Sequence, residues 1–181
     1  MMFARTERLT LRPGWIEDAP ALLAAIGHEA VVRNLSRVPW PYTLADAEAF
    51  VGAWQGDPGP LFLIFSHDSG RCNLIGGIGI GPLGDLPHVM GYWLTPSAWG
   101  RGYAVEAGRA VLDIAATLGI AQVVAGHYVD NPASGAVLRK LGFAATGTRS
   151  SIHSRGRGMD VETIDYAIDL ADRRHDRRLA A

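Results

Sequence analysis

Hydrophobic residues alternate with polar ones near the start of the chain. In Glu7–Arg12, Leu9 and Leu11 are separated by polar side chains, a period typical of a half-buried strand. Helices are expected after Asp18 and Thr43, which we predict to be their N-caps. Further on, apolar runs between turn residues predict a β-meander. The elements expected next are helices over 19–26 and 44–54, strands over 61–66, 73–81 and 87–95, and turns over 67–70 and 82–86.

The second half of the chain changes to alternating helices and strands. Hydrophobic residues recur at helical spacing over 103–118, and Gly119 is expected to end that helix. Asn131 should cap a short helix over 132–141, because Pro132 suits a first helical position. Strands are expected over 123–129, 143–153 and 161–170, before a charged tail over 171–181. The order β-α-α-β-β-β-α-β-α-β-β indicates an α/β (α+β) fold in one domain, 1–181, with about seven strands in a mixed, mostly antiparallel sheet.

Composition narrows the class of protein. The 181 residues are 48% hydrophobic and 19% charged, which excludes disorder as the main state. A formal net charge of -1 provides no broad basic surface for nucleic acid. With Cys72 as the one cysteine, a disulfide within the chain is excluded, and no ligand spacing suggests a metal. Because apolar runs are short and no signal-peptide pattern is present, we expect a cytoplasmic protein without membrane or nucleic-acid partners.

A glycine-rich loop joins the third strand of the meander to the long helix. Gly100 and Gly102 flank Arg101 just before the helix begins. Helix N-termini present backbone N–H groups and partial positive charge, so this loop favours a phosphate-bearing ligand. The phosphate-loop motif of nucleotide hydrolases is absent, and Val105 stands where a dinucleotide fingerprint needs its third glycine. A plain glycine turn is the alternative interpretation.

Several motifs occur in a recognisable order. They are Gly91-Tyr92-Trp93-Leu94, Trp99-Gly100-Arg101-Gly102-Tyr103-Ala104, Asn131-Pro132-Ala133-Ser134 and Leu141-Gly142-Phe143. Together with the opening Glu7–Arg12, they resemble the GNAT superfamily of acetyl-CoA-dependent N-acetyltransferases. The pattern is similar to the branch of ribosomal-protein N-terminal (RimJ/RimL-type) acetyltransferases. Trp99 departs from this pattern, because the family usually has a polar residue there.

The resemblance implies where the cofactor binds. The GNAT sheet splays beside the strand that ends at Leu94, and acetyl-CoA would lie in that split. An amine would attack the thioester directly, and the backbone N–H of Leu94 would hold the oxyanion. The residues implied at the cofactor are Trp93, Leu94, Thr95, Trp99, Gly100, Arg101, Gly102, Tyr103, Ala104, Asn131 and Ser134. The resemblance also admits a homodimer.

This sequence lacks two residues that often transfer protons in the family. The tyrosine that often protonates the leaving thiolate is replaced by Leu138. We expect Ser134 to hydrogen-bond the sulfur, directly or through water, and helix capping is its alternative role. The glutamate that often serves as base is replaced by Val89, which leaves His88, His127 or water. These gaps keep open a non-catalytic acyl-CoA-binding or regulatory module, with a dinucleotide oxidoreductase as a third reading.

The acceptor pocket should be formed by the first half of the chain. Asn34, Trp40 and Tyr42 lie in the irregular stretch 28–42, which in this branch helps to wall the pocket. The closing hairpin, 149–157, would form another wall. Loop packing is the alternative role for Trp40 and Tyr42. The sequence leaves the acceptor open between a protein N-terminus and a small-molecule amine.

Overall fold

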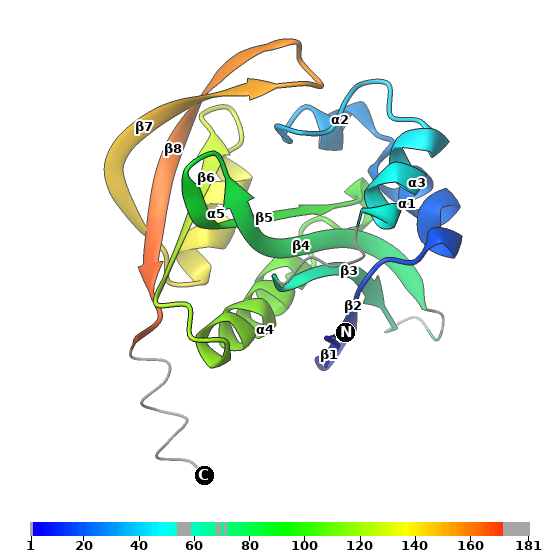
Figure 1. Ribbon diagram of the computed structural model, residues 1–181, viewed down its shortest axis with the longest axis horizontal. Helices are drawn as coiled ribbons and strands as arrows, with labels where there is room; N and C mark the ends of the chain where they lie inside the picture. Colours follow the sequence, from blue (N-terminus) through cyan, green and yellow to red (C-terminus); the bar gives the residue numbers. More distant parts are fainter. Residues whose placement is uncertain (1, 54–58, 68–69, 71, 172–181) are drawn as a thin grey trace.

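A computed structural model describes residues 2–53, 59–67, 70 and 72–171. Within these residues, one eight-stranded sheet has the order β1-β2-β3-β4-β5-β6-β8-β7 (Figure 1). Its strands are β1 (Ala4–Arg5), β2 (Leu9–Arg12), β3 (Leu61–Ser66), β4 (Asn73–Leu83), β5 (Leu86–Leu94), β6 (Gln122–Tyr128), β7 (Ala144–Ser154) and β8 (Met159–Asp169). The helices are η1 (Ile16–Asp18), α1 (Ala19–Ile26), α2 (Glu29–Val32), α3 (Leu44–Gly52), η2 (Pro96–Ala98), α4 (Tyr103–Thr117) and α5 (Pro132–Lys140).

The predicted mixed sheet is confirmed, with β5 and β6 as its parallel pair and antiparallel pairing elsewhere. The described sheet gains a strand through β1, a short segment that pairs with β2. The turn expected over 82–86 is shorter than predicted, since Leu83 pairs with Leu86. Gly84 has a φ of 57°, a left-handed conformation that lets the chain reverse within two residues.

The structure confirms the N-cap predicted at Thr43, whereas the side-chain cap predicted at Asp18 is wrong. Thr43 and Asp46 form a capping box, in which each side chain accepts a hydrogen bond from the other residue's N–H. Asp18 does not cap α1 with its side chain. Its carboxylate instead accepts from the N–H of Trp15 and forms two 2.7 Å hydrogen bonds with Arg12. The predicted helix end at Trp54, part of the turn over 67–70 and the tail over 172–181 lie outside the described residues.

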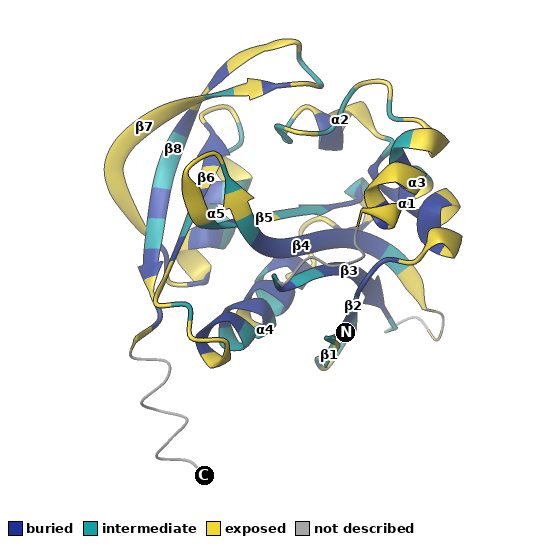
Figure 2. Ribbon diagram, viewed as in Figure 1, coloured by how far each residue is buried: buried dark blue, intermediate teal, exposed yellow. Residues whose placement is uncertain are grey.

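Helices cover both faces of the sheet (Figures 1 and 2). Strand β3 explains why both faces are apolar. Phe62 and Ile64 join the core beneath α4 and α5, whereas Leu63 and Phe65 join the core beneath α1 and α3. Strand β7 is exposed along most of its length, and none of the described helices covers it (Figure 2).

The parallel strands β5 and β6 touch at one point. Their register contains the single pair Val89 and Val124, and beyond it the strands diverge. Strand β4 supports β5 on the other side, where a Cβ at Gly77 would lie 2.6 Å from Nε1 of Trp93. Glycine there lets the Trp93 ring lie close against β4. None of the described helices has both the length and the apolar character needed to cross a membrane.

Candidate functional site

A cleft of roughly 1150 Å³ opens where β5 and β6 diverge. Most of the residues that the resemblance places at the cofactor line this cleft. They are Trp93, Leu94, Trp99, Gly100, Gly102, Tyr103, Ala104, Asn131 and Ser134. Thr95 and Arg101 belong to the same segment but are not among the lining residues. Within the described residues, no group of three or more His, Cys, Asp or Glu is arranged to hold a metal ion.

The last residues of β5 divide their backbone groups between two neighbours. Thr95 donates its N–H to the carbonyl of Ile75 at 2.8 Å, so this amide is used inside the β4–β5 ladder. Successive residues of a strand turn their backbone groups to opposite edges, and the N–H of Leu94 therefore faces the split. The carbonyl of Leu94 faces the same way and accepts a 2.8 Å hydrogen bond from Nε1 of Trp99.

The loop before α4 has the backbone shape that a phosphate cradle requires. Gly100 and Gly102 have φ values of 73° and 84°, in the left-handed region that favours glycine. A Cβ at Gly100 would have no neighbour within 4 Å, so the backbone there is open to an approaching group. Helix α4 begins directly after Gly102, and its first turn brings N–H groups and a partial positive charge. The loop can therefore hold a pyrophosphate.

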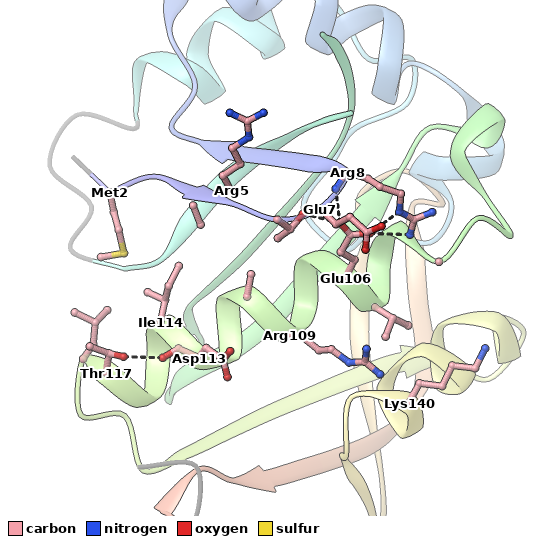
Figure 3. A pocket seen from close by; sticks show the side chains of 16 residues that line it. Met2, Arg5, Glu7, Arg8, Glu106, Arg109, Asp113, Ile114, Thr117 and Lys140 are labelled. Carbon is pink, nitrogen blue, oxygen red and sulfur yellow. Dashed lines mark hydrogen bonds and ion pairs between the residues drawn. The ribbon is translucent and has the colours of Figure 1, made fainter. Parts of the chain in front are cut away.

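An acidic side chain ties this loop to the N-terminal strands (Figure 3). Glu106 on α4 accepts hydrogen bonds from the hydroxyl of Thr6 at 2.6 Å and from the N–H and Nε of Arg8 at 2.9 and 2.8 Å. Arg8 also donates to the carbonyl of Arg101 at 3.1 Å. Burial raises the pKa of the Glu106 carboxyl, but the hydrogen bonds from Thr6 and Arg8 outweigh it and leave the pKa below its usual value.

A second cavity, of roughly 1060 Å³, lies between β1 and the outer side of α4 (Figure 3). Gly102 is the one predicted site residue among those that line it. Lys140, at the end of α5, lines both this cavity and the cleft. It therefore places a positive charge beside the loop end of the cleft.

Ser134 shares its hydroxyl with a tyrosine of β5. The Tyr92 hydroxyl lies 2.7 Å from Oγ of Ser134 and 2.9 Å from the Ser134 carbonyl oxygen. Burial raises the pKa of Tyr92 to about 12, although the hydrogen bond with Ser134 acts in the opposite direction. The phenol therefore stays protonated near neutral pH. Asn131 caps α5 as predicted, because its Oδ1 accepts from the N–H of Ser134.

The two candidate histidines lie on different strands, His88 on β5 and His127 on β6. His88 is not among the residues that line the cleft. His127 is 7% exposed and donates from Nδ1 to the carbonyl of Tyr128 at 2.8 Å. A Cβ at Gly135 would lie 2.4 Å from Nε2 of His127, so the other ring nitrogen packs directly against helix α5. His127 therefore packs between β6 and α5, and it also lies among the residues that line the cleft.

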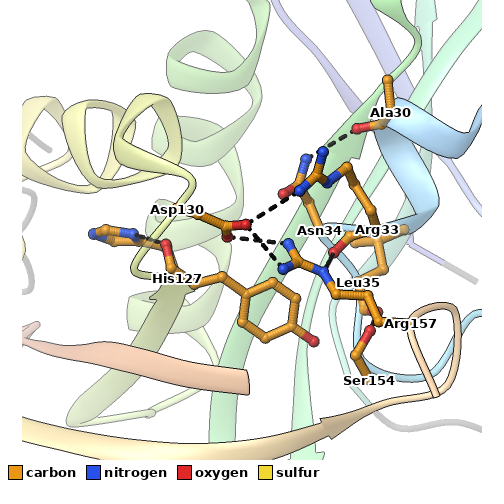
Figure 4. Close-up of polar contacts among 9 residues, drawn as sticks. Ala30, Arg33, Asn34, Leu35, His127, Asp130, Ser154 and Arg157 are labelled. Atoms are coloured by element: carbon orange, nitrogen blue, oxygen red, sulfur yellow. Dashed lines mark hydrogen bonds and ion pairs between the residues drawn. The ribbon is translucent and has the colours of Figure 1, made fainter. Parts of the chain in front are cut away.

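The closing hairpin is held over the cleft by ionic contacts (Figure 4). Arg157 forms two hydrogen bonds with Asp130, at 2.9 and 3.0 Å, and donates from Nε to the carbonyl of Arg33 at 2.6 Å. Arg33 reaches the same carboxylate at 3.2 Å. The hydrogen bond from Arg157 is the main reason that the pKa of Asp130 is lowered. We call Arg33, Asp130 and Arg157 the hairpin clamp.

The predicted acceptor residues separate in the structure. Asn34 lines the cleft and donates from Nδ2 to the carbonyl of Ala30 at 2.9 Å. Trp40 and Tyr42 are not among the lining residues, and Tyr42 packs against the core beneath α1 and α3. Burial is the main reason that the pKa of Tyr42 is raised to about 12, and the nearby Asp46 adds to it.

Sequence reasoning missed two features of the cleft. Tyr92 was part of a quoted motif but was not assigned to the site, because its contact with Ser134 joins segments far apart in the chain. Asp165 on β8 lines the cleft and was not considered. Asp165 is two residues from Thr163, so the alternation of side chains along a strand places both on one face of the predicted strand. This spacing is the feature of the sequence that could have pointed to Asp165.

Comparisons with known proteins agree with this geometry. Residues 8–144 match the sequence model of the family described as Acetyltransferase (GNAT) domain. The chain is 28% identical over 172 residues to the Uncharacterized N-acetyltransferase YoaA of Bacillus subtilis (strain 168), covering 90% of this chain and 94% of that protein.

Solved structures share the fold over nearly the whole chain. A GNAT-family acetyltransferase from Bacillus anthracis matches with a TM-score of 0.77 and 23% identity, over 93% of this chain and 98% of that one. RimL, a ribosomal L7/L12 alpha-N-protein acetyltransferase solved with coenzyme A, matches with a TM-score of 0.73, 23% identity and the same coverage, 93% and 98%. These likenesses show the fold, and the presence of RimL among them is consistent with the predicted branch. With its family match over residues 8–144, the chain belongs to the GNAT acetyltransferase family.

Proposed function

We propose that this acetyltransferase moves the acetyl group of acetyl-CoA to a primary amine, with both substrates bound in the cleft. The observation that carries the proposal is the split between β5 and β6, with the N–H of Leu94 facing it and the Gly100–Gly102 loop at one end. These groups fit the two polar parts of acetyl-CoA. The loop and the start of α4 would bind the pyrophosphate, and the exposed edge of β5 would pair with the pantetheine arm.

Lys140 extends this binding site in our proposal. It lies beyond the loop, on the border of the two cavities. An ammonium there would attract the negative charges of the nucleotide part of coenzyme A. The relative solved with coenzyme A has the same fold, which supports an acyl-CoA substrate for this chain.

The chemistry would be direct acyl transfer. A neutral amine attacks the thioester carbonyl, and the carbon–sulfur bond breaks as the amide bond forms. The N–H of Leu94 would stabilise the negative charge on the carbonyl oxygen in the tetrahedral intermediate. The nitrogen loses its proton to water, and the leaving thiolate takes one from the hydroxyl of Ser134, which takes a proton from Tyr92 in turn; the Tyr92 phenolate then regains its proton from water.

Tyr92 gives Ser134 a source for that proton. Its hydroxyl has one hydrogen and lies within reach of both Oγ and the carbonyl oxygen of Ser134. When the phenol donates to Oγ, the serine hydrogen is released to point at the sulfur. Since Tyr92 is protonated near neutral pH, the pair is ready to donate before the thiolate forms.

Thiol release from acetyl-CoA, measured with a panel of amines and N-terminal peptides, tests the proposal. We expect coenzyme A to be released only in the presence of an acceptor, together with an acetylated product in the mass spectrum. Thermal stabilisation by coenzyme A without turnover on any acceptor would favour the non-catalytic acyl-CoA-binding module instead. That alternative is kept by Val89 and Leu138, which replace the family's usual base and acid.

A further inference from the structure

One peptide unit of the loop before α4 is held by an arginine from the start of the chain. Nη1 of Arg8 donates a 3.1 Å hydrogen bond to the carbonyl of Arg101. That carbonyl belongs to the trans peptide unit that joins Arg101 to Gly102. In a trans peptide the C=O and N–H groups point in opposite directions. The hydrogen bond from Arg8 therefore fixes the direction of the Gly102 N–H as well.

The N–H of Gly102 points away from Arg8, toward the cleft. Arg8 lines the second cavity and is not among the residues that line the cleft, whereas Gly102 lines both. The peptide unit thus stands between the two, with its oxygen on the Arg8 side and its N–H on the cleft side. Among the backbone hydrogen bonds of the described turns and loops, none uses this N–H as its donor. It is therefore ready to bind a ligand in the cleft.

The guanidinium of Arg8 has a fixed place of its own (Figure 3). Its Nε and Nη2 lie 2.8 and 2.7 Å from Oε2 of Glu106, and the backbone N–H of Arg8 donates to Oε1 at 2.9 Å. The guanidinium also lies over the ring of Tyr103, 4.7 Å from its centroid. The lowered pKa of Glu106 keeps this carboxylate charged near neutral pH. Because a guanidinium is planar and rigid, these contacts direct Nη1 at the carbonyl of Arg101.

Without the hydrogen bond from Arg8, the peptide unit could turn over. Gly102 has a φ of 84°, and glycine adopts positive and negative φ with similar ease. Rotation of the unit would bring the carbonyl oxygen of Arg101 to the cleft in place of the N–H of Gly102. The partial negative charge of a carbonyl oxygen repels a phosphate, whereas a backbone N–H binds it. The glycine thus permits two orientations of the peptide, and Arg8 stabilises the one that suits an anion.

We propose that Arg8 is a positioning residue for the phosphate loop, because it locks the Arg101–Gly102 peptide with its N–H toward the cleft. The inference rests on the proposed function, since it concerns the loop that would bind the pyrophosphate. It adds a residue that lies 93 positions before the loop in the chain and does not line the cleft. Glu106 acts through Arg8 by holding its guanidinium. Arg8 should therefore matter only for ligands that carry the pyrophosphate.

Titration calorimetry with coenzyme A and with pantetheine tests this inference, because pantetheine lacks the pyrophosphate and the nucleotide. Arg8→Lys keeps the positive charge but lacks the planar fork that binds Glu106 and Arg101 together. We expect it to raise the Kd of coenzyme A about tenfold, which is the effect of losing one hydrogen bond to a charged group. The Kd of pantetheine should change by less than about twofold.

Two further variants keep the test specific. Arg5→Lys is the matched control, because Arg5 is an exposed arginine that lines the same second cavity, and it should leave the Kd of both ligands unchanged. Glu106→Gln should raise the Kd of coenzyme A in the same direction as Arg8→Lys. Combined in one chain, the two substitutions should weaken binding no more than Arg8→Lys alone, since Glu106 acts through Arg8. Thermal unfolding of each variant verifies that it is folded at the temperature of the titration.

The outcomes are distinguishable. Equal losses of affinity for coenzyme A and pantetheine in Arg8→Lys would indicate a general distortion of the cleft and overturn the inference. Unchanged binding of coenzyme A in Arg8→Lys would overturn it as well, because a positive charge without the fork would then be sufficient. Binding of coenzyme A by the wild type without thiol release on any amine would overturn the proposed transfer reaction alone. Failure of the wild type to bind coenzyme A would overturn both.

Discussion

The hydroxyl pair of Tyr92 and Ser134 concentrates the proposed proton chemistry in two side chains. Ser134 stands at the start of α5, where its N–H is held by the capping residue Asn131. Its side chain is left to face Tyr92 on β5. The backbone N–H of Ser134 thus takes part in helix capping and its hydroxyl is left for proton donation, so one residue can have both roles.

Ser134→Ala is expected to lower kcat by about 10²-fold, because it removes the proposed proton donor to the thiolate. The KM of acetyl-CoA should stay within about twofold, since the phosphate loop is untouched. Tyr92→Phe should act in the same direction and cost about 1 kcal/mol of stability through the lost hydrogen bond. Thiol release, followed in a stopped assay at saturating concentrations of both substrates, measures kcat for each variant. Ser97→Ala, at an exposed serine outside the cleft, is the matched control, and unchanged turnover in Ser134→Ala would contradict the assignment.

At the scale of elements, ionic contacts fasten the β7–β8 hairpin through Asp130, whose side chain is 40% exposed, and helix α4 through the more buried Glu106. Gly156 shows how closely the hairpin approaches the first half of the chain. A Cβ there would lie 2.6 Å from Cγ1 of Val32 and 3.1 Å from the carbonyl of Val38. The hairpin clamp then fixes this contact from the side of α5 (Figure 4).

Breaking the hairpin clamp should affect the acceptor more than acetyl-CoA. Arg157→Met removes the two hydrogen bonds to Asp130, and we expect a loss of about 1–2 kcal/mol in the free energy of unfolding. The KM of the acceptor should rise while the KM of acetyl-CoA stays constant, because the clamp holds the β7–β8 hairpin and does not touch the phosphate loop. Arg149→Met is the control, since its pair with Glu162 is solvent-exposed and contributes less than about 0.5 kcal/mol. An equal effect of the two substitutions on the acceptor KM would contradict this role.

Glu106 makes the attachment of α4 depend on pH. Its folded-state pKa lies below the unfolded value, so the ionised carboxylate stabilises the fold above the unfolded pKa. This contribution is lost as the pH falls through the folded pKa. Glu106→Gln should therefore cost about 1–3 kcal/mol at neutral pH, and the difference from the wild type should narrow in acid.

Urea unfolding between neutral pH and about pH 3 measures the effect of Glu106→Gln. Glu7→Gln is the matched control, because Glu7 is an exposed carboxylate on the same N-terminal segment (Figure 3). A difference that stays constant across the pH range would show that the ionised form of Glu106 does not stabilise the fold.

For the whole molecule, the split sheet predicts a ligand-dependent stability. Coenzyme A bridges β5, the loop and α4 in our proposal, so it should bind the folded chain alone. At a concentration about 100 times its Kd, it should add about 2.7 kcal/mol to the free energy of unfolding. For a chain of this length, that corresponds to a rise of about 5–10 °C in Tm. Differential scanning fluorimetry measures the shift, with NAD as the control, and equal stabilisation by NAD would favour a dinucleotide site.

Local rules predicted most of the elements because their signals lie within a few residues. The capping box of Thr43 and Asp46 and the N-cap at Asn131 needed only short-range hydrogen bonds. Strand β1 was missed because two residues carry no detectable period, and it forms by pairing with β2. Asp18 was assigned the wrong partner, since a nearby arginine competed with the helix terminus for its carboxylate.

The sequence by itself determined the order of the elements other than β1 and α2, the glycine loop before α4 and the family, because each depends on residue types at fixed short spacings. The tertiary structure decided which side chains meet. It set the Tyr92 hydroxyl against Ser134, packed His127 against Gly135 and brought Asp165 to the wall of the cleft. These arrangements follow from strand register and from the divergence of β5 and β6, which join residues from distant parts of the chain. Contacts across such distances in sequence leave no periodic signal, so the partners of these three residues become visible only in the folded chain.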